Sequence, residues 1–196
     1  MSSPFVWKGS PALPGVGKAQ TSLWSVSRNP AGLPPEPSLT STERCLAYLF
    51  DTDAVSEVLR KRPLPAYLEW LATIPPAEQF TSAVVVGELY RGAFRSVHRD
   101  RHLANIEGRI LSALTVLPYD HSMACVYGEI HAALTTSGRI LEDADLQIAA
   151  TAIHHGLELV TANVQHFERI QTLRLQHVLA DAKRAAVKEQ AQRSAT

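Results

Sequence analysis

The chain has 196 residues and carries 19 acidic and 19 basic side chains, so its formal net charge is zero. This balance argues against a protein that packages nucleic acid or coats an anionic membrane through its overall field, although it leaves room for a small basic groove. Two isolated cysteines without metal-ligand spacing exclude a zinc finger and a disulfide-rich scaffold.

Residues 1–44 differ in composition from the rest of the chain. They hold seven of the twelve prolines and are otherwise rich in glycine, serine and threonine, with no hydrophobic periodicity. Such a segment cannot bury enough apolar surface to offset its conformational entropy, so we expect a disordered extension or a mis-annotated translation start. The sequence shows no signal-peptide h-region and no apolar run of ~20 residues, which predicts a soluble cytoplasmic protein.

From Cys45 onward, short apolar runs alternate with helical patterns. Strands are predicted over residues 45–50, 79–81, 115–117, 157–161 and 173–178. Helices are predicted over residues 53–60, 65–73, 98–114, 120–136, 143–155 and 163–169, with a further helix beginning after Ser82. Residues 45–180 are therefore the predicted folded domain, and residues 181–196, which lack a clear apolar stripe, are predicted to be a frayed tail.

Several helix ends carry capping signals. Asp53, Ser82 and Asp120 are the predicted N-caps of the helices that follow them. Residues 137–138 and Gly156 are predicted to end helices, because glycine readily adopts the left-handed conformation of a helix C-terminus.

This alternation of strands and helices predicts the α/β class. Consecutive strands joined by helices form right-handed crossovers, which place the strands parallel and cover both faces of the sheet. We therefore expect a three-layer α/β/α domain with a central parallel sheet of about four to five strands. In such sheets the ligand crevice lies at the carboxyl ends of the strands.

Four polar side chains stand just after predicted strands or near the starts of predicted helices. Asp51 follows the first strand and Asn163 follows the strand at 157–161. Glu88 lies less than two turns into the helix that begins after the second strand, and Asp145 lies in the first turn of its helix. These positions belong to the same edge of a parallel sheet, so the four side chains are predicted to converge.

Clustered carboxylates indicate a hard divalent cation. Two or three acids within a few ångström repel one another unless a cation neutralises them, and oxygen ligands suit Mg²⁺ or Mn²⁺. Because no cysteine, serine or histidine triad accompanies them, the chemistry indicated is metal-assisted phosphodiester hydrolysis. Asp53 is a supporting candidate beside the first acid, and the hydroxyls of Thr52 and Thr161 are candidates to orient the carboxylates.

Each of these residues also has a purely structural interpretation. Asp51 and Asn163 could act only as helix N-caps, and Asp145 could be a first-turn acid that the helix dipole favours. Asp143 competes with Asp145 for the site. We predict Asp145, because a helix beginning near residue 143 would use Asp143 as its cap.

Three arginines follow Glu88. Arg91, Arg95 and Arg99 are spaced at i, i+4 and i+8, so they form a stripe that begins one turn past Glu88 if the helix continues. They could contact phosphate or form a solvated helix face. Alternatively, Arg91 or Arg95 is the structural partner of Glu88, since an unpaired acid on an otherwise apolar face is costly to bury.

Residues 49–57, 82–92, 145–152 and 159–167, taken in order, closely resemble the motifs of the PIN-domain family, and most closely those of the VapC/FitB-like toxins of bacterial type II toxin–antitoxin modules. The resemblance covers about residues 46–178. It aligns Asp51, Glu88 and Asp145 with the acidic residues of the family, and it places Asn163 where many relatives have aspartate. Asparagine keeps an oxygen ligand but loses a charge. We therefore expect a three-carboxylate site, with Asn163 acting through water or holding another side chain in place.

The resemblance implies a Mg²⁺- or Mn²⁺-dependent endoribonuclease that inhibits translation by cutting RNA, which in many relatives is tRNA or ribosomal RNA. It also implies a homodimer and a small antitoxin, encoded alongside, that blocks the site and binds DNA. Arg91 and Arg95 then become candidates for RNA binding. Two alternatives stay open: a PIN-like nuclease that acts on DNA, and a catalytically impaired PIN-like binding or scaffold module, which the asparagine at position 163 favours.

Overall fold

The computed structural model describes residues 46–136, 138 and 141–194. The extension expected over residues 1–44 lies outside the described residues, as do Cys45 and Ser137. Among the helices that are described, none is both long and apolar enough to cross a membrane.

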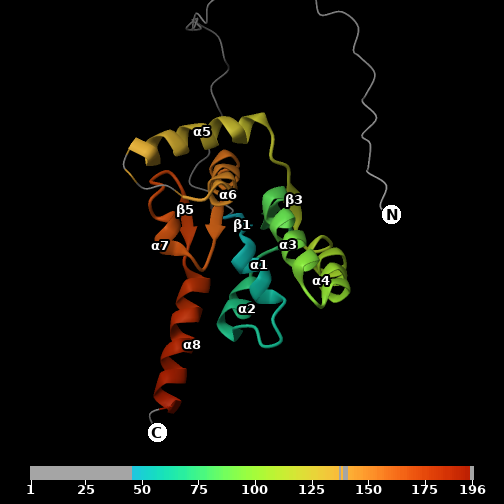
Figure 1. The fold of residues 1–196 in the computed structure, drawn as a ribbon. Helices are drawn as coiled ribbons and strands as arrows, with labels where there is room; N and C mark the ends of the chain where they lie inside the picture. Colours follow the sequence, from blue (N-terminus) through green and yellow to red (C-terminus); the bar gives the residue numbers. More distant parts are fainter. Residues whose placement is uncertain (1–45, 137, 139–140, 195–196) are drawn as a thin grey trace, which may run out of the picture. The chain divides into compact units, whose positions relative to one another are not determined.

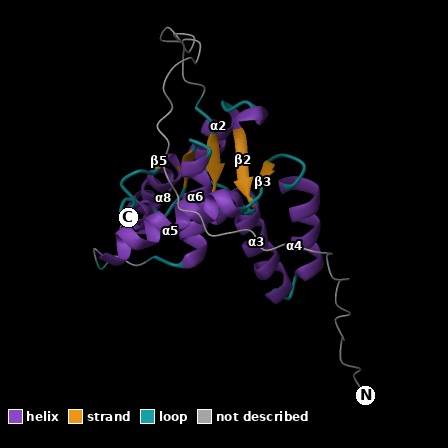
Figure 2. Cartoon of the chain, turned by 90° about the horizontal axis from the view of Figure 1, so that it is seen from above, coloured by secondary structure: helices purple, strands orange, loops and turns teal. Residues whose placement is uncertain are grey.

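Five parallel strands form a single sheet in the order β3-β2-β1-β4-β5. The strands are β1 (Tyr48–Phe50), β2 (Gln79–Ser82), β3 (Thr115–Leu117), β4 (Glu158–Val160) and β5 (Arg174–Gln176). The central strand β1 consists of three buried residues, as expected for a parallel strand covered on both faces. Figure 2 shows β2 and β3 side by side, in line with their pairing.

In the described part of the chain, eight α-helices connect and flank these strands. They are α1 (Thr52–Val58), α2 (Pro65–Ala72), α3 (Ala83–Arg95), α4 (Arg99–Asn105), α5 (His121–Thr136), α6 (Asp143–His154), α7 (Val164–Phe167) and α8 (Val178–Ser194), and a π-helical turn (Ile106–Ile110) follows α4. Helix α5 packs on α6, α1 packs on α3, and α8 packs on α2 (Figure 1). The predicted three-layer α/β/α domain with a central parallel sheet is thus confirmed.

Two of the predicted caps are confirmed and one is wrong. The Ser82 hydroxyl accepts a hydrogen bond from the backbone N–H of Val85 at 3.2 Å, and the Asp120 carboxylate accepts one from Ser122 at 2.8 Å. Asp53 does not cap the first helix. That helix begins at Thr52, so Asp51 is its N-cap and Asp53 lies inside its first turn.

The C-terminal part of the chain also differs from the prediction. The last strand ends at Gln176, and Val178, which the hydrophobic pattern assigned to that strand, begins α8. Residues 181–194, expected to belong to a frayed tail, continue this helix. Its first turns bury Leu179, Ala180 and Ala182, so a short apolar patch anchors it without a stripe along its length.

The order of the strands determines where a ligand can bind. From β1 the chain moves outward to β2 and β3, then returns to the other side of β1 to form β4 and β5. The direction of winding therefore changes between the neighbouring strands β1 and β4, and the crevice of such a sheet opens at their carboxyl ends.

Candidate active site

A cavity of about 220 Å³ lies at the carboxyl ends of β1 and β4. It gathers the three predicted acids, the predicted asparagine and two of the predicted supporting residues. Its lining consists of Asp51, Thr52, Asp53, Glu88, Asp145, Ile148, Asn163 and Phe167.

Asp51 is held at the bottom of this site by backbone geometry. Its N–H donates to the carbonyl of Val160 at 3.2 Å, which extends the pairing of β1 with β4 by one residue. Its carboxylate accepts the N–H of Ala54 at 2.8 Å as the cap of α1, and it also accepts a hydrogen bond from the Thr161 hydroxyl. Only 6% of the residue is exposed.

Burial raises the pKa of Asp51 from its ordinary value of 3.8 to about 7. The two hydrogen bonds, from Thr161 and Ala54, partly oppose this rise, whereas the charges of Asp53 and Asp145 add to it. A carboxyl group that is costly to ionise and close to other acids is typical of a site at which a cation binds.

Glu88 reaches the cavity from α3 and is held by two partners. The Thr52 hydroxyl donates to its Oε2, and the Arg91 guanidinium lies 3.2 Å from its Oε1. Arg91 is therefore the partner that the structural interpretation anticipated, although its side chain is largely exposed and the pair is correspondingly weak. Arg95, in the last turn of α3, is also exposed.

Asp145 enters the cavity from the first turn of α6, and its partner is a histidine. Nε2 of His166 lies 3.0 Å from Oδ2 of Asp145. This buried nitrogen has no hydrogen bond of good geometry within the described part of the chain. Burial raises the pKa of Asp145, the His166 charge opposes the rise, and the charges of Glu142 and Glu88 add to it.

The competing acid, Asp143, lies outside the cavity. It is exposed and accepts a hydrogen bond from the Tyr127 hydroxyl at 2.8 Å. It does not cap α6 either, because that helix begins at Asp143 itself and Glu142 occupies the cap position. The structure thus places Asp145, and not Asp143, among the other acids.

Asn163 lies on the rim. Its backbone N–H donates to the Thr161 hydroxyl at 2.9 Å, which fixes the turn after β4. Although Asn163 stands at the cap position of α7, its side chain makes no capping hydrogen bond. The exposed amide is therefore not engaged as a cap and lines the cavity.

Asp53 belongs to the opposite rim and is partly compensated by α8. Lys183 places its Nζ 3.8 Å from Oδ2 of Asp53, and about half of the Asp53 side chain is exposed. An exposed pair at this distance contributes little stability. It nevertheless brings a cation from α8 to the edge of the acidic cavity.

The donor set suits a hard divalent cation. Four carboxylates, one amide and one hydroxyl line the cavity and offer oxygen atoms, the ligand type that Mg²⁺ and Mn²⁺ prefer. The raised pKa values of Asp51 and Asp145 indicate carboxyl groups whose negative charge the nearby cations do not fully offset. Among residues 46–136, 138 and 141–194, however, no three acidic, histidine or cysteine side chains already have the arrangement of a metal site, and each acid has a protein partner.

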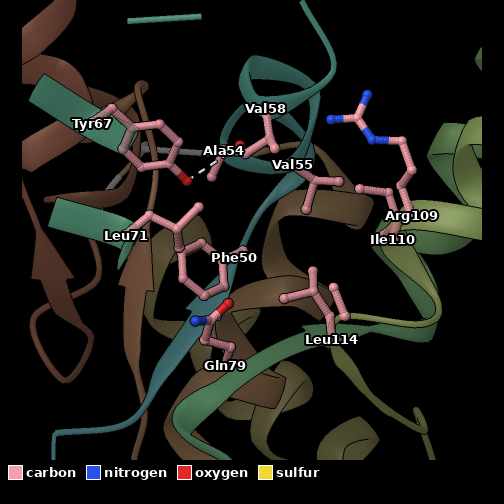
Figure 3. Close-up of a pocket in the computed structure, with 11 residues that line it drawn as sticks. Phe50, Ala54, Val55, Val58, Tyr67, Leu71, Gln79, Arg109, Ile110 and Leu114 are labelled. Atoms are coloured by element: carbon pink, nitrogen blue, oxygen red, sulfur yellow. Dashed lines mark hydrogen bonds between the residues drawn. The ribbon is translucent and has the colours of Figure 1, made fainter. Parts of the chain in front are cut away.

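Figure 3 shows a separate cavity of about 160 Å³ between α1 and α2. Its lining is mostly apolar. The buried Tyr67 hydroxyl donates to the carbonyl of Ala54 at 3.2 Å, and burial raises the pKa of Tyr67. Because this hydroxyl stays protonated and the cavity holds no carboxylate, we assign the reactive site to the acidic cavity at the strand ends.

His166 and Lys183 are site residues that the sequence interpretation missed. His166 follows Asn163 by one turn, and that spacing is a signal that could have identified it. Lys183 gave no such signal, because its helix was expected to be a frayed tail.

Comparison with known proteins identifies the family of this chain. Residues 48–173 match the family described as PIN domain. Ribonuclease VapC2 of Haemophilus influenzae is 36% identical over 132 residues, which cover 67% of this chain and 98% of that protein. The tRNA(fMet)-specific endonuclease VapC of Salmonella typhimurium is 31% identical over 131 residues, with coverages of 67% and 97%.

A solved structure agrees with these sequence relatives. The crystal structure of DNA-bound VapBC from Salmonella typhimurium superposes with a TM-score of 0.61 at 32% identity, covering 67% of this chain and 97% of that one. The match therefore extends over nearly the whole length of the relatives and includes every strand end that supplies an acid. The chain belongs to the PIN-domain family, alongside the VapC and FitB ribonuclease toxins.

Proposed function

We propose that this protein is the toxin of a type II toxin–antitoxin module, a metal-dependent endoribonuclease that inhibits translation by cutting RNA. The observation that carries the proposal is the convergence of Asp51, Glu88 and Asp145 on one cavity at the switch point of the sheet, in a chain whose relatives are ribonucleases. Phosphodiester hydrolysis needs a way to offset charge on the phosphate, and these acids can hold the cation that does so.

Mg²⁺ or Mn²⁺ bound by these three carboxylates would offset negative charge on the phosphoryl and attacking oxygens. The chain's own groups keep the acids in position. Ala54 and Thr161 fix the Asp51 carboxylate, and the Thr52 hydroxyl fixes one oxygen of Glu88. His166 holds Asp145 and, when protonated, helps to keep it ionised.

Asn163 contributes an amide to the lining of the cavity. In our proposal it contacts the cation through water or orients the phosphodiester, because an amide adds an oxygen and two N–H donors without adding charge. Phosphate contacts from Arg91 and Arg95 belong to the same proposal.

The named relatives support the proposed substrate and antitoxin partner. One relative is named for specificity toward tRNA(fMet), and a solved neighbour is a VapBC complex bound to DNA. We propose tRNA or ribosomal RNA as substrate, a small cognate antitoxin that also binds DNA, a homodimeric toxin and a cytoplasmic location.

The test compares two acid-to-amide substitutions. Asp51→Asn is expected to abolish cleavage of RNA in the presence of Mg²⁺ or Mn²⁺, and EDTA is expected to abolish cleavage by the wild type. Asp143→Asn is the matched control, since Asp143 is close in sequence to Asp145 but lies outside the cavity. Full metal-dependent cleavage by Asp51→Asn would overturn the assignment.

The substrate class is tested in the same assay. Matched RNA and DNA strands of one sequence distinguish a ribonuclease from a PIN-like nuclease that acts on DNA. A catalytically impaired binding module, the interpretation that Asn163 favours, predicts no cleavage of either strand and no growth arrest when the toxin is expressed alone.

A further inference from the structure

A second and larger cavity adjoins the acidic one. It has a volume of about 540 Å³ and lies between α1, α3 and α4. Thr52 and Glu88 line both cavities, so the two adjoin at these side chains. We call it the α1–α4 groove. The polar and charged residues that line it include Ser56, Arg60, Lys61, Arg101, His102 and Asn105.

The sign of the charge reverses between the two cavities. The acidic cavity contains four carboxylates and no lysine or arginine in its lining. The α1–α4 groove contains Arg60, Lys61 and Arg101, and its single carboxylate is the shared Glu88. A phosphodiester strand is repelled by acids before any cation binds, so it needs positive charge beside the reacting position.

Two of these cations are available to a ligand. Arg60 lies 3.3 Å from the buried carboxylate of Glu57 and is partly engaged there. Lys61 and Arg101, by contrast, are exposed, and no described acidic side chain lies within 4.0 Å of either. They belong to opposite walls, since Lys61 follows α1 and Arg101 lies on α4. A strand lying between them would meet a cation on each side.

The floor of the groove leaves space for such a strand. Gly92 of α3 lines the groove, and a Cβ built at this position meets no atom within 4 Å. Ser56 and Asn105 add neutral hydrogen-bonding groups on the two walls. Hydroxyl and amide groups of this kind contact phosphate and sugar oxygens in nucleic-acid complexes.

We propose that the α1–α4 groove carries the RNA strand on one side of the scissile phosphate, with Lys61 and Arg101 binding the neighbouring phosphates. This inference rests on the proposed ribonuclease function and adds the route of the substrate. It adds phosphate contacts from residues outside α3, the helix that carries Arg91 and Arg95.

The first experiment measures RNA binding without cleavage. In the Asp51→Asn background with EDTA, fluorescence anisotropy of a labelled 12-nucleotide single-stranded RNA is compared for Lys61→Ala, Arg101→Ala and the double variant. The double variant is expected to bind roughly tenfold more weakly, and its salt slope is expected to fall by about 0.7 for each lost phosphate contact. Arg169→Ala and Lys188→Ala are matched controls, because each removes an exposed cation outside the groove.

A steric variant tests the same groove without changing charge. Gly92→Leu is expected to fold normally, since helix propensity favours leucine and the added Cβ meets no atom. It should weaken RNA binding and raise KM more than it lowers kcat. Gly128→Leu, at an exposed helical glycine of α5 with equal space around it, is the control and should change neither quantity.

Failure of this inference can be separated from failure of the proposed function. If the wild type cuts no RNA, the ribonuclease assignment fails, and the anisotropy measurement still reports on the groove. Unchanged affinity in both Lys61→Ala/Arg101→Ala and Gly92→Leu would overturn the proposed route. The same conclusion follows if these variants lose binding of the co-expressed antitoxin while RNA affinity and KM stay constant, because the groove would then be a peptide site.

Discussion

Asp51 is deeply buried, yet the proposed function requires its carboxylate to be ionised. Its pKa of about 7 means that between about pH 4 and pH 7 the folded protein keeps a proton that the unfolded chain has already released. The free energy of unfolding therefore falls as the pH rises through this window. The rise from 3.8 to about 7 corresponds to a loss of up to about 4 kcal/mol above pH 7.

Asp51→Asn should remove this pH-dependent loss, because an amide oxygen can still accept the N–H of Ala54 and carries no charge. In EDTA, the variant is expected to be more stable than the wild type at pH 8, and the difference should shrink toward pH 5. Urea unfolding at the two pH values measures it. A difference that does not change with pH would show that Asp51 ionises as freely in the folded chain as in the unfolded one.

His166 affects the proposed reaction through Asp145. Burial raises the pKa of Asp145 and the His166 charge opposes that rise, so His166→Gln should raise the pKa of Asp145 further. The acid limb of the pH–rate profile for kcat/KM is expected to move to higher pH. His154→Gln, at an exposed histidine in the last turn of α6, is the control. An unmoved acid limb in His166→Gln would contradict this positioning role.

At the scale of elements, α8 divides into an anchored start and an exposed remainder. Leu179 is fully buried, whereas Val187–Ser194 are exposed, and Figure 1 shows the later turns extending beyond α2. Leu179→Ala should therefore cost about 2–5 kcal/mol of unfolding free energy. Ending the chain after Ala186 should cost almost nothing. Denaturant titration measures the free energy of unfolding of both variants, with Val187→Ala as control. Equal losses of unfolding free energy in the two variants would contradict this prediction.

The shape of the α1–α4 groove depends on how helices α1, α3 and α4 pack against one another. Arg101 and Asn105 of α4 line the groove, and α4 continues into a π-helical turn in which Ile106 and Ile110 are both buried. The wider turn fixes the end of α4 against the core. No spacing rule links Lys61 to Arg101, which are 40 positions apart (101 minus 61), so the sequence did not reveal their shared groove.

At the scale of the whole molecule, the buried hydrophobic residues of the described chain run from Tyr48 to Ala182. The PIN-domain match also lies inside this range. Residues 43–196, which form one compact unit, are expected to fold and cut RNA without the preceding segment. Thermal unfolding and kcat/KM of that fragment should match those of the full chain, and a lower melting temperature would show that the N-terminal segment stabilises the domain.

Much of the fold could be predicted because its signals are local. Short apolar runs located all five strands, and Ser82 and Asp120 capped the helices that they were expected to cap. The cap of α1 was misassigned by two positions, because Asp51 and Asp53 carry the same capping chemistry and only the end of β1 distinguishes them.

The candidate site was partly predictable for the same reason. Asp51 and Asn163 follow strands β1 and β4, and Glu88 and Asp145 lie near the starts of helices that meet the same edge of the sheet, so the four side chains converge. The contacts of His166 and Lys183 depend instead on the orientation of α7 and on the existence of α8. Helix α8 was expected to be frayed, because only its first turns are buried and a helix anchored at one end shows no apolar stripe in its sequence.

The burial of Asp51 has a consequence for thermodynamic measurements. Near neutral pH its carboxyl group is about half protonated, so a cation that takes this oxygen as ligand must displace a proton into the solvent. The heat of Mn²⁺ binding in titration calorimetry should then vary with the ionisation enthalpy of the buffer, and the affinity should increase from pH 6 to pH 8. Cation binding at the carboxyl end of β1 would thus be coupled to the release of protons from Asp51.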